Sequence, residues 1–377
     1  MNFKFGAIAL ALAAPAAFAQ SSVTVYGVVD AYGEYLHGAS TDVRVQSGGL
    51  NGSRIGFKGT EDLGSGYYVD FALEGGLNLD TGSSAQGGAL FGRQAFGALR
   101  STEFGTISAG RQYSTLYTIT DQFSVFSNTP AGASTAIIGG FAGGYEPVQG
   151  SSATATTLSN ATGAGLNGSP ARVNNSVRYT TPSFSGFTAS GLYGAGEITG
   201  QTTKTRLYDL SARYTGYGLD AVVSFVNDKA QGAALATSAD VNIITVAAKY
   251  TIDVAHIEAG YLHGDDKRNI AVKQSGQGFW VGADYRIGAS LLKAQYVHNK
   301  LDNTGAGYAI VSGNTAKTNA YGLGYQYDLS KRTSVYTSAT RMQNKGVARF
   351  DTSIPAGLTA AGDLSINQYV LGIRHSF

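Results

Sequence analysis

One stretch near the C-terminal end decides the fold: Tyr321-Gly322-Leu323-Gly324-Tyr325-Gln326-Tyr327. Large apolar residues alternate in it with glycine or glutamine, and the side chains of a β-strand point alternately to the two faces of its sheet. One face of this segment is therefore apolar, and the other is small or polar. The same alternation recurs along the chain, for example in the segments 187–193, 208–214 and 279–286. The sequence thus predicts an all-β protein.

The connections between these segments alternate between short and long. Seven are tight turns, and the eight longer links begin with His37 to Leu50 and include Asp80 to Gly88, Tyr113 to Ala171 and Asn299 to Ala316. Fifteen connections join sixteen strands. An even strand number with short turns at one rim and long loops at the other is typical of a bacterial transmembrane β-barrel. We therefore expect a 16-stranded antiparallel barrel that closes on itself, because open sheet edges are not tolerated in lipid.

Composition excludes several other classes. No stretch beyond the N-terminus has eighteen uninterrupted apolar residues, and with 14% charged and 43% hydrophobic residues the chain fits neither a helical membrane protein nor a disordered one. The net charge is +2 and the basic residues are not clustered, which argues against nucleic-acid binding. A large soluble all-β protein stays as an alternative, but its outward face should carry Lys and Glu in place of Tyr, Leu and Ile.

The first nineteen residues have the pattern of an export signal. Lys4 provides a positive start, Phe5 to Ala14 is an apolar run, and Ala17-Phe18-Ala19 is a small-x-small cleavage site. We expect residues 1–19 to be a signal peptide and residues 20–377 to form the barrel. The absence of cysteine from all 377 residues removes disulfides and thiolate metal ligands, so no metal or cofactor is expected.

Several motifs carry a resemblance to a known family. The chain closes on an alternating segment that ends in Phe377, and further matches are Ser22 to Asp30, Gly52 to Gly64, Arg93 to Phe96 and Asn174 to Tyr179. These motifs resemble the general diffusion porins of Gram-negative outer membranes, in their β-proteobacterial branch. The resemblance implies an outer-membrane homotrimer, embedded in lipid, that passes small hydrophilic solutes and ions without catalysis. It also implies that the third long loop folds into the barrel.

Inward-pointing charges are the candidate functional residues, because fixed charges at a narrow point select the ions that pass through a passive channel. The alternation places Arg54 and Lys58 on one inward face, opposite the apolar residues of their segment, and does the same for Arg93, Arg172 and Glu74. We therefore expect these five side chains to face the lumen.

The family resemblance adds roles for particular residues. It implies that Arg54, Arg93 and Arg172 are basic residues of the wall, that Glu74 is their acidic partner, and that Asp121 is the carboxylate of the inward loop. Arg111 opens that loop and is a further candidate base, as is Lys58. Because three arginines then face two carboxylates, we expect weak selectivity for anions.

Two other functions remain open from the sequence. A substrate-specific channel, for sugars for example, would use a file of inward aromatic residues, for which Tyr26, Tyr32, Tyr68 and Trp280 are available. A barrel hydrolase would need a serine or threonine beside a histidine at the lumen rim or on the lipid side. No hydrolase motif is found, and we interpret His256 with Glu258 as a pore-lining pair.

Overall fold

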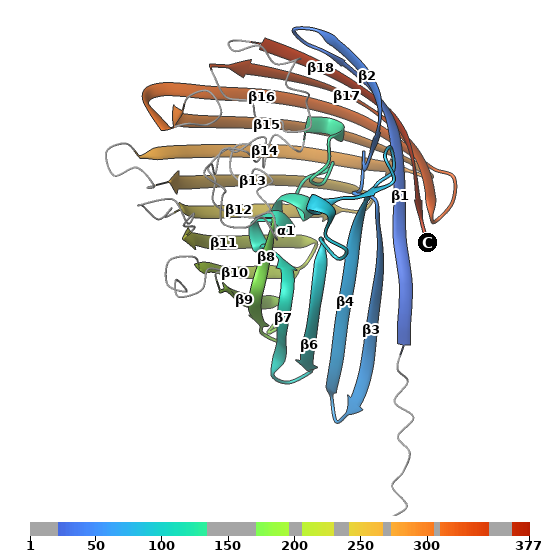
Figure 1. Ribbon diagram of the computed structural model, residues 1–377, viewed down its shortest axis with the longest axis vertical. Coiled ribbons are helices and arrows are strands. Elements are labelled where there is room, and N and C mark those ends of the chain that lie inside the picture. Colours follow the sequence, from blue (N-terminus) through green and yellow to red (C-terminus); the bar gives the residue numbers. More distant parts are fainter. Residues whose placement is uncertain are drawn as a thin grey trace, which may run out of the picture.

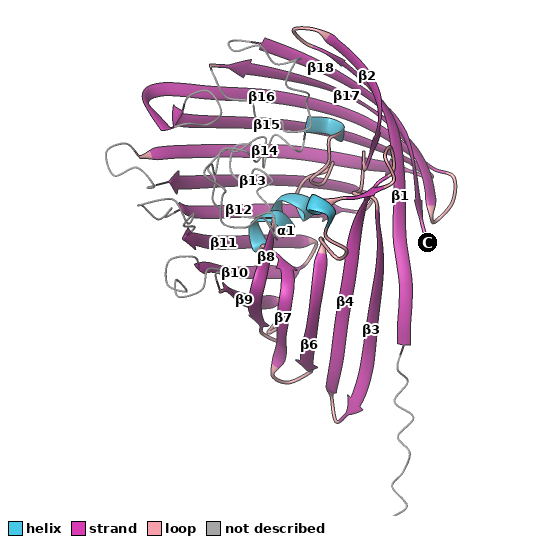
Figure 2. Cartoon of the chain, viewed as in Figure 1, coloured by secondary structure: helices cyan, strands magenta, loops and turns pink. Residues whose placement is uncertain are grey.

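The computed structural model describes residues 22–133, 171–195, 206–229, 241–266, 273–304, 310–346 and 364–377. Almost all of this part is β-strand, with short helical pieces at α1 (Thr115–Gln122), η1 (Gln86–Gly88) and η2 (Ala131–Ala133) (Figure 2). The strands are β1 (Ser22–His37), β2 (Thr41–Ser47), β3 (Arg54–Gly64), β4 (Tyr67–Asn78), β5 (Ser83–Ser84), β6 (Gln94–Ser101), β7 (Gly105–Tyr113), β8 (Arg172–Thr180), β9 (Phe187–Gly194), β10 (Arg206–Gly216), β11 (Leu219–Lys229), β12 (Val241–Ile252), β13 (Ala255–Asp266), β14 (Gln274–Ile287), β15 (Ser290–Thr304), β16 (Ile310–Asp328), β17 (Thr333–Lys345) and β18 (Leu364–Ser376).

These strands form one antiparallel sheet that closes where β1 pairs with β18 (Figure 1). β2 and β3 pair with successive halves of β1, so together they count as one barrel strand, and the two-residue β5 pairs only with the end of β4. Sixteen barrel strands remain of the eighteen. The predicted 16-stranded barrel is therefore confirmed.

The short connections lie where the alternation predicted them. Tight turns occur, for example, at residues 65–66, 217–218 and 288–289, between neighbouring antiparallel strands. The first strand, β1, is bound to the last residue of the chain. The amide of Gly27 donates to the carbonyl of Phe377, and the amide of Phe377 donates to the carbonyl of Gly27, both at 3.1 Å. This pairing satisfies backbone groups that an open edge would leave unpaired.

The first long link was predicted incorrectly. Residues within His37 to Leu50 form the strand β2, which alternates outward Val43 and Val45 with inward residues. Arg44 pairs there with Glu34 of β1, with Nε 2.6 Å from Oε2. Cross-strand pairs of this kind stabilise a sheet, which explains why a short polar segment continues the barrel here.

The seventh long link is also shorter than predicted. We expected Asn299 to Ala316 to be a loop, but β15 continues to Thr304 and β16 already begins at Ile310. The register between these strands shifts between Asp302 and Thr304, which indicates a β-bulge near the loop. The strands therefore extend further on the long-loop side than the alternation of apolar residues indicated.

The two faces of the sheet differ as the alternation requires. Leu323 and Leu371 on the outer face are 64% and 70% exposed, whereas the inward Asp30 and Asp209 are fully buried. An apolar outer face and a polar inner face are what a barrel in lipid needs. Among the described residues, no helix has both the length and the apolar character needed to cross a bilayer.

The segment 114–133, which begins the third long link, packs against inward-facing groups of the opposite wall. The amide of Thr115 donates to Asp209 of β10, and Trp280 of β14 donates through Nε1 to the carbonyl of Phe123, both at 2.5 Å. At Gly322 of β16, an added Cβ would lie 2.4 Å from the carbonyl oxygen of Gly132, so only glycine fits this contact. Residues 134–170 lie outside the described part, and the inward fold of the whole loop stays a prediction.

Candidate functional site

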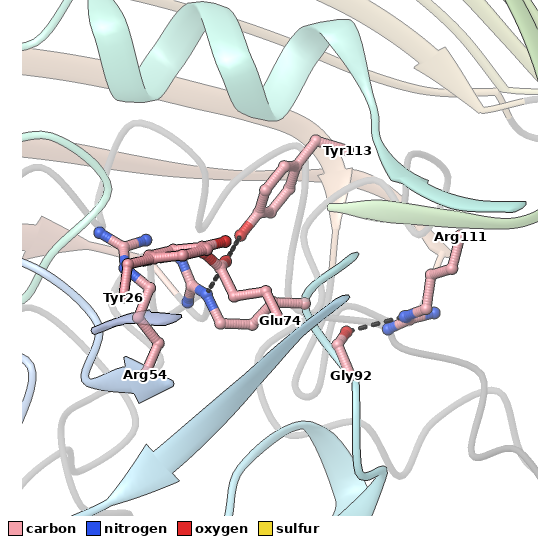
Figure 3. Close-up of polar contacts among 7 residues, drawn as sticks. Tyr26, Arg54, Glu74, Gly92, Arg111 and Tyr113 are labelled. Atoms are coloured by element: carbon pink, nitrogen blue, oxygen red, sulfur yellow. Dashed lines mark hydrogen bonds and ion pairs between the residues drawn. The ribbon is translucent and has the colours of Figure 1, made fainter. Parts of the chain in front are cut away.

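Glu74 is the centre of the site. It projects inward from β4, and its carboxylate is almost completely buried. Its Oε1 accepts hydrogen bonds from Arg93 Nε at 2.7 Å and from the Tyr113 hydroxyl at 3.2 Å, while Oε2 accepts one from the Tyr26 hydroxyl at 2.9 Å (Figure 3). Three donors from three different parts of the chain therefore fix this carboxylate.

The strand register explains why arginines gather around Glu74. Gly56 of β3 and Gln94 of β6 are its direct cross-strand partners. Arg54 lies two positions from Gly56 on the same inward face, and its Nε is 3.9 Å from Oε2 of Glu74 (Figure 3). Arg93 immediately precedes Gln94. The sheet thus brings Arg54 to the carboxylate as a diagonal neighbour on one sheet face. Arg93 reaches the same carboxylate from the other side, from the residue before β6, where the strand alternation does not apply.

Arg172 joins this cluster through aromatic rings. It is the first residue of β8 and is buried, and its guanidinium lies 5.0 Å from the ring centre of Tyr113 and 5.3 Å from that of Tyr117. The two rings are stacked 4.9 Å apart, and Arg93 lies over the Tyr113 ring at 5.8 Å. Cation–π contacts of this kind hold a guanidinium in place without neutralising its charge.

The sequence therefore identified four members of one cluster: Arg54, Arg93, Arg172 and Glu74. It missed Tyr113 and Tyr117, which hold two of these arginines. Tyr113 ends β7 and Tyr117 lies in the first turn of α1, so no single strand or helix period relates the two tyrosines in the sequence. A net excess of positive charge results, with three guanidinium groups and one carboxylate.

Asp121 does not belong to this cluster in the described structure. It lies in α1, and its Oδ1 accepts a hydrogen bond from the amide of Asn128 at 3.2 Å. Within the described ranges no ion pair joins it to an arginine. The carboxylate holds together the turn that follows α1, a role for which a loop sequence gives no periodic signal.

Arg111 and Lys58 lie beside the cluster and do not contact Glu74. Arg111 of β7 donates through Nε to the carbonyl of Gly92 at 2.7 Å and through Nη1 to Asn174, so its guanidinium braces three wall segments (Figure 3). The exposed amine of Lys58 lies over the Tyr26 ring at 5.2 Å. Lys58 follows Arg54 by four strand positions, or roughly 13 Å along β3.

The inward aromatic residues do not form a common surface. Trp280 and Tyr32 are buried, Tyr68 lies under Arg100 with 4.1 Å between guanidinium and ring centre, and the hydroxyl of Tyr26 is bound to Glu74. Each ring is used by a different protein neighbour. The structure therefore does not bring these four residues together as one row of aromatic rings that could bind a solute.

The histidines have structural partners. His256 Nδ1 lies 2.8 Å from Asp284 Oδ1, and two other histidines contact threonine hydroxyls, His37 with Thr41 at 3.1 Å and His375 with Thr333 at 2.8 Å. A hydrolytic site needs a third group that orients the histidine. In the described part of the chain, no carboxylate is hydrogen-bonded to His37 or His375, and His256, which has a carboxylate partner, has no hydrogen bond to a serine or threonine hydroxyl. The described residues also contain no group of three potential metal ligands.

Comparisons with known proteins agree with this architecture. The family described as Gram-negative porin matches residues 6–347. Outer membrane porin protein 32 of Delftia acidovorans is 30% identical over 384 residues, covering 98% of both chains, and an outer membrane porin of Bordetella pertussis is 31% identical over 422 residues, covering 97% of this chain and 96% of its own.

A solved structure supports the same assignment. The anion-selective porin from Comamonas acidovorans superposes with a TM-score of 0.74 at 27% identity, over 95% of this chain and all of that one. The predicted relationship to β-proteobacterial porins is thereby confirmed, and with it the location in the outer membrane. The chain belongs to the Gram-negative porin family.

Proposed function

We propose that this porin forms a water-filled channel for the passive diffusion of small hydrophilic solutes and ions, with a weak preference for anions. The observation that carries the proposal is a cluster of three arginines with one carboxylate: Arg54 and Arg93 contact Glu74, and Arg172 lies over the ring of Tyr113, which is bound to Glu74. A barrel of sixteen strands is wide enough to enclose water. The selectivity is then decided where inward charges come closest together.

The mechanism is electrostatic. An ion at a narrow point loses part of its hydration shell, and the donors of fixed guanidinium groups replace the lost water around an anion. One carboxylate offsets one of the three positive charges, so two remain. Because the cluster is held by hydrogen bonds and stacked rings, these charges do not move away when a cation enters. The preference stays weak because the Debye length is about 8 Å at physiological salt and screens the charges from ions further away.

The same proposal includes the partners that the sequence predicted. The chain acts as a homotrimer in outer-membrane lipid, its substrates are small ions and hydrophilic solutes, and transport proceeds without catalysis or cofactor. We also retain residues 1–19 as a removable signal peptide. Chemical cross-linking of the purified protein tests the trimer, and the N-terminal sequence of the mature chain tests cleavage before Gln20.

The reversal potential of the wild-type channel tests the selectivity. Purified protein in a planar bilayer between two KCl solutions should give a potential with the sign of chloride preference, larger at 0.1 M than at 1 M salt. A channel selective for potassium would contradict the proposal. A saturable block of the ion current by a sugar would instead favour a substrate-specific channel.

A further inference from the structure

A cavity lies at the short-turn rim, away from the strands that carry the arginine cluster. Its volume is about 310 Å³, it is open to solvent on one side, and it is lined by the β14–β15 turn, the β16–β17 turn and the last strand, β18. That volume is at the lower end of the range for small-molecule sites. The side chains that matter among those lining it are Arg286, Asp328, Lys331, Arg332, Ser334 and Arg374.

Positive charge dominates this cavity. Four of its lining residues are cationic, and Asp328 is the single carboxylate among them. Both oxygens of Asp328 are already engaged, since Oδ2 accepts from Arg286 Nη1 at 2.7 Å and Oδ1 accepts from Gln326 Nε2 at 2.7 Å. The remaining three positive charges therefore have no lining carboxylate to offset them. An anionic ligand would supply that missing charge.

Two buried polar groups in the wall of the cavity also lack a partner. Ser334 is 1% exposed, and its Oγ has no hydrogen bond within the described part of the chain; the same holds for Nε of Arg374. The two residues are direct cross-strand partners in the register of β17 and β18. Arg374 is oriented by Asn51, whose Oδ1 lies 3.3 Å from Nη1. Buried donors without an acceptor are costly, so this pair is suited to an incoming acceptor.

We propose that this cavity is a second anion site, separate from the arginine cluster, that binds a small oxyanion such as inorganic phosphate. Oxyanions accept several hydrogen bonds at once and match the donor geometry of guanidinium groups. Arg374 and Ser334 are the fixed donors, whereas Lys331 and Arg332 come from a solvent-exposed turn and add long-range attraction. The site lies at the short-turn rim, so anions encounter it at the opposite end from the long loops.

The test is the affinity of the purified, folded protein for inorganic phosphate, measured by titration calorimetry at low ionic strength. We expect Arg374→Gln to weaken binding at least tenfold. The double variant Lys331→Gln/Arg332→Gln, whose changes lie in an exposed turn and leave the barrel strands untouched, should weaken it by a smaller factor. Arg93→Gln is the control for the arginine cluster and should change the phosphate affinity less than threefold.

A crystal soaked in selenate locates the ion directly. We expect an anomalous peak between Arg374 and Ser334 in the wild-type protein and its loss in Arg374→Gln. Unchanged phosphate affinity in both cavity variants, or a loss of binding only in Arg93→Gln, would overturn the proposal. The reversal potential in KCl separates this result from the selectivity proposal, because cavity variants should retain the wild-type sign whether or not phosphate binds.

Discussion

On the wall that carries β3, β4 and β6, arginines surround a carboxylate, whereas on the wall formed by β10 to β15, cations hold the segment 114–133. Arg213 and Lys249 lie over the ring of Phe123 at 5.4 and 5.6 Å, and Lys293 lies over the ring of Phe126 at 5.6 Å. Arg213 and Lys249 also donate to the side-chain and backbone oxygens of Gln122, at 2.8 and 2.7 Å. Cations on the second wall are therefore used for attachment.

An inward position therefore does not by itself decide what a cation does. Arg93 and Lys249 have the same sign and both face inward, yet one is placed by Glu74 and Tyr113 and the other by a phenylalanine ring and a carbonyl. The first arrangement leaves excess charge at one level of the barrel. The second uses the cation to hold the segment 114–133, which faces the first wall.

Arg93→Glu should have the largest effect on selectivity. The substitution changes the local charge by two and sets a second carboxylate beside Glu74, so we expect the preference to change from anions to cations. The measurement is the reversal potential across a KCl gradient. Lys249→Glu makes the same change of charge on the opposite wall, and we expect it to retain the wild-type sign. Equal shifts in the two variants would show that the walls do not differ in this way.

Phe123→Ala should release the segment 114–133. Removing a buried phenylalanine side chain costs about 3 to 5 kcal/mol, and here the loss includes the ring that Arg213 and Lys249 share. We expect higher single-channel conductance with more current noise, and faster hydrogen exchange of the amides in α1. Phe184→Ala is the control, because this ring is 66% exposed at a short turn. Unchanged conductance and exchange in Phe123→Ala would mean that the attachment does not depend on this ring.

The comparison of the two walls assumes that one face of the sheet lies in lipid and the other in the lumen. Leu323→Arg tests this assumption. An arginine on the lipid face near the middle of the barrel should cost about 2 to 4 kcal/mol of folding free energy in a bilayer. Gln326→Arg, three residues further along β16, faces inward beside Asp328, whose carboxylate can accept from the new guanidinium, and it should cost less than Leu323→Arg. Folding titrations in urea with lipid vesicles measure both. Similar costs at the two positions would contradict the assignment of the faces.

The alternation of apolar residues was enough to predict the barrel and the inward position of Arg54, Arg172 and Glu74. Arg93 also reaches Glu74, but it does so from the residue before β6, because the register places Gln94 and Phe96, not Ala95 and Gly97, on the face of Glu74. The alternation worked because lipid imposes one apolar face on every strand, so each strand carries the same signal. Residues outside the strands carry no such signal. Three features depend on packing between distant segments and could not be read from the sequence. They are the contacts of the segment 114–133 with the opposite wall, the contacts of Asp121 and the role of Tyr113.

The short strand β2 shows a different limit. Thr41 to Ser47 does alternate, with Val43 and Val45 outward, but it was counted within a loop because it is short and lies next to an irregular segment. That segment is held by Asp30, whose carboxylate accepts the amides of Gly49, Leu50 and Asn51 at 3.1, 2.8 and 2.8 Å. A carboxylate that binds three backbone amides is a tertiary contact, and no local pattern predicts it.

Asp121→Asn should have the smallest effect, and it tests whether this residue acts at the constriction. Asparagine retains an oxygen that can accept the amide of Asn128, so the turn after α1 should keep its geometry while one negative charge is lost. Glu74→Gln removes the same charge from the group that contacts Arg93 and Arg54. At 0.1 M KCl, where the Debye length is about 10 Å, we expect Glu74→Gln to shift the reversal potential further toward anions than Asp121→Asn does. At 1 M KCl that length falls to about 3 Å, and the shift from Asp121→Asn should disappear while part of the shift from Glu74→Gln remains. If Asp121→Asn shifted the potential as much as Glu74→Gln at both salt concentrations, Asp121 would act at the narrowest point, as the family resemblance implied. Two carboxylates, Asp121 and Glu74, would then offset the three arginines.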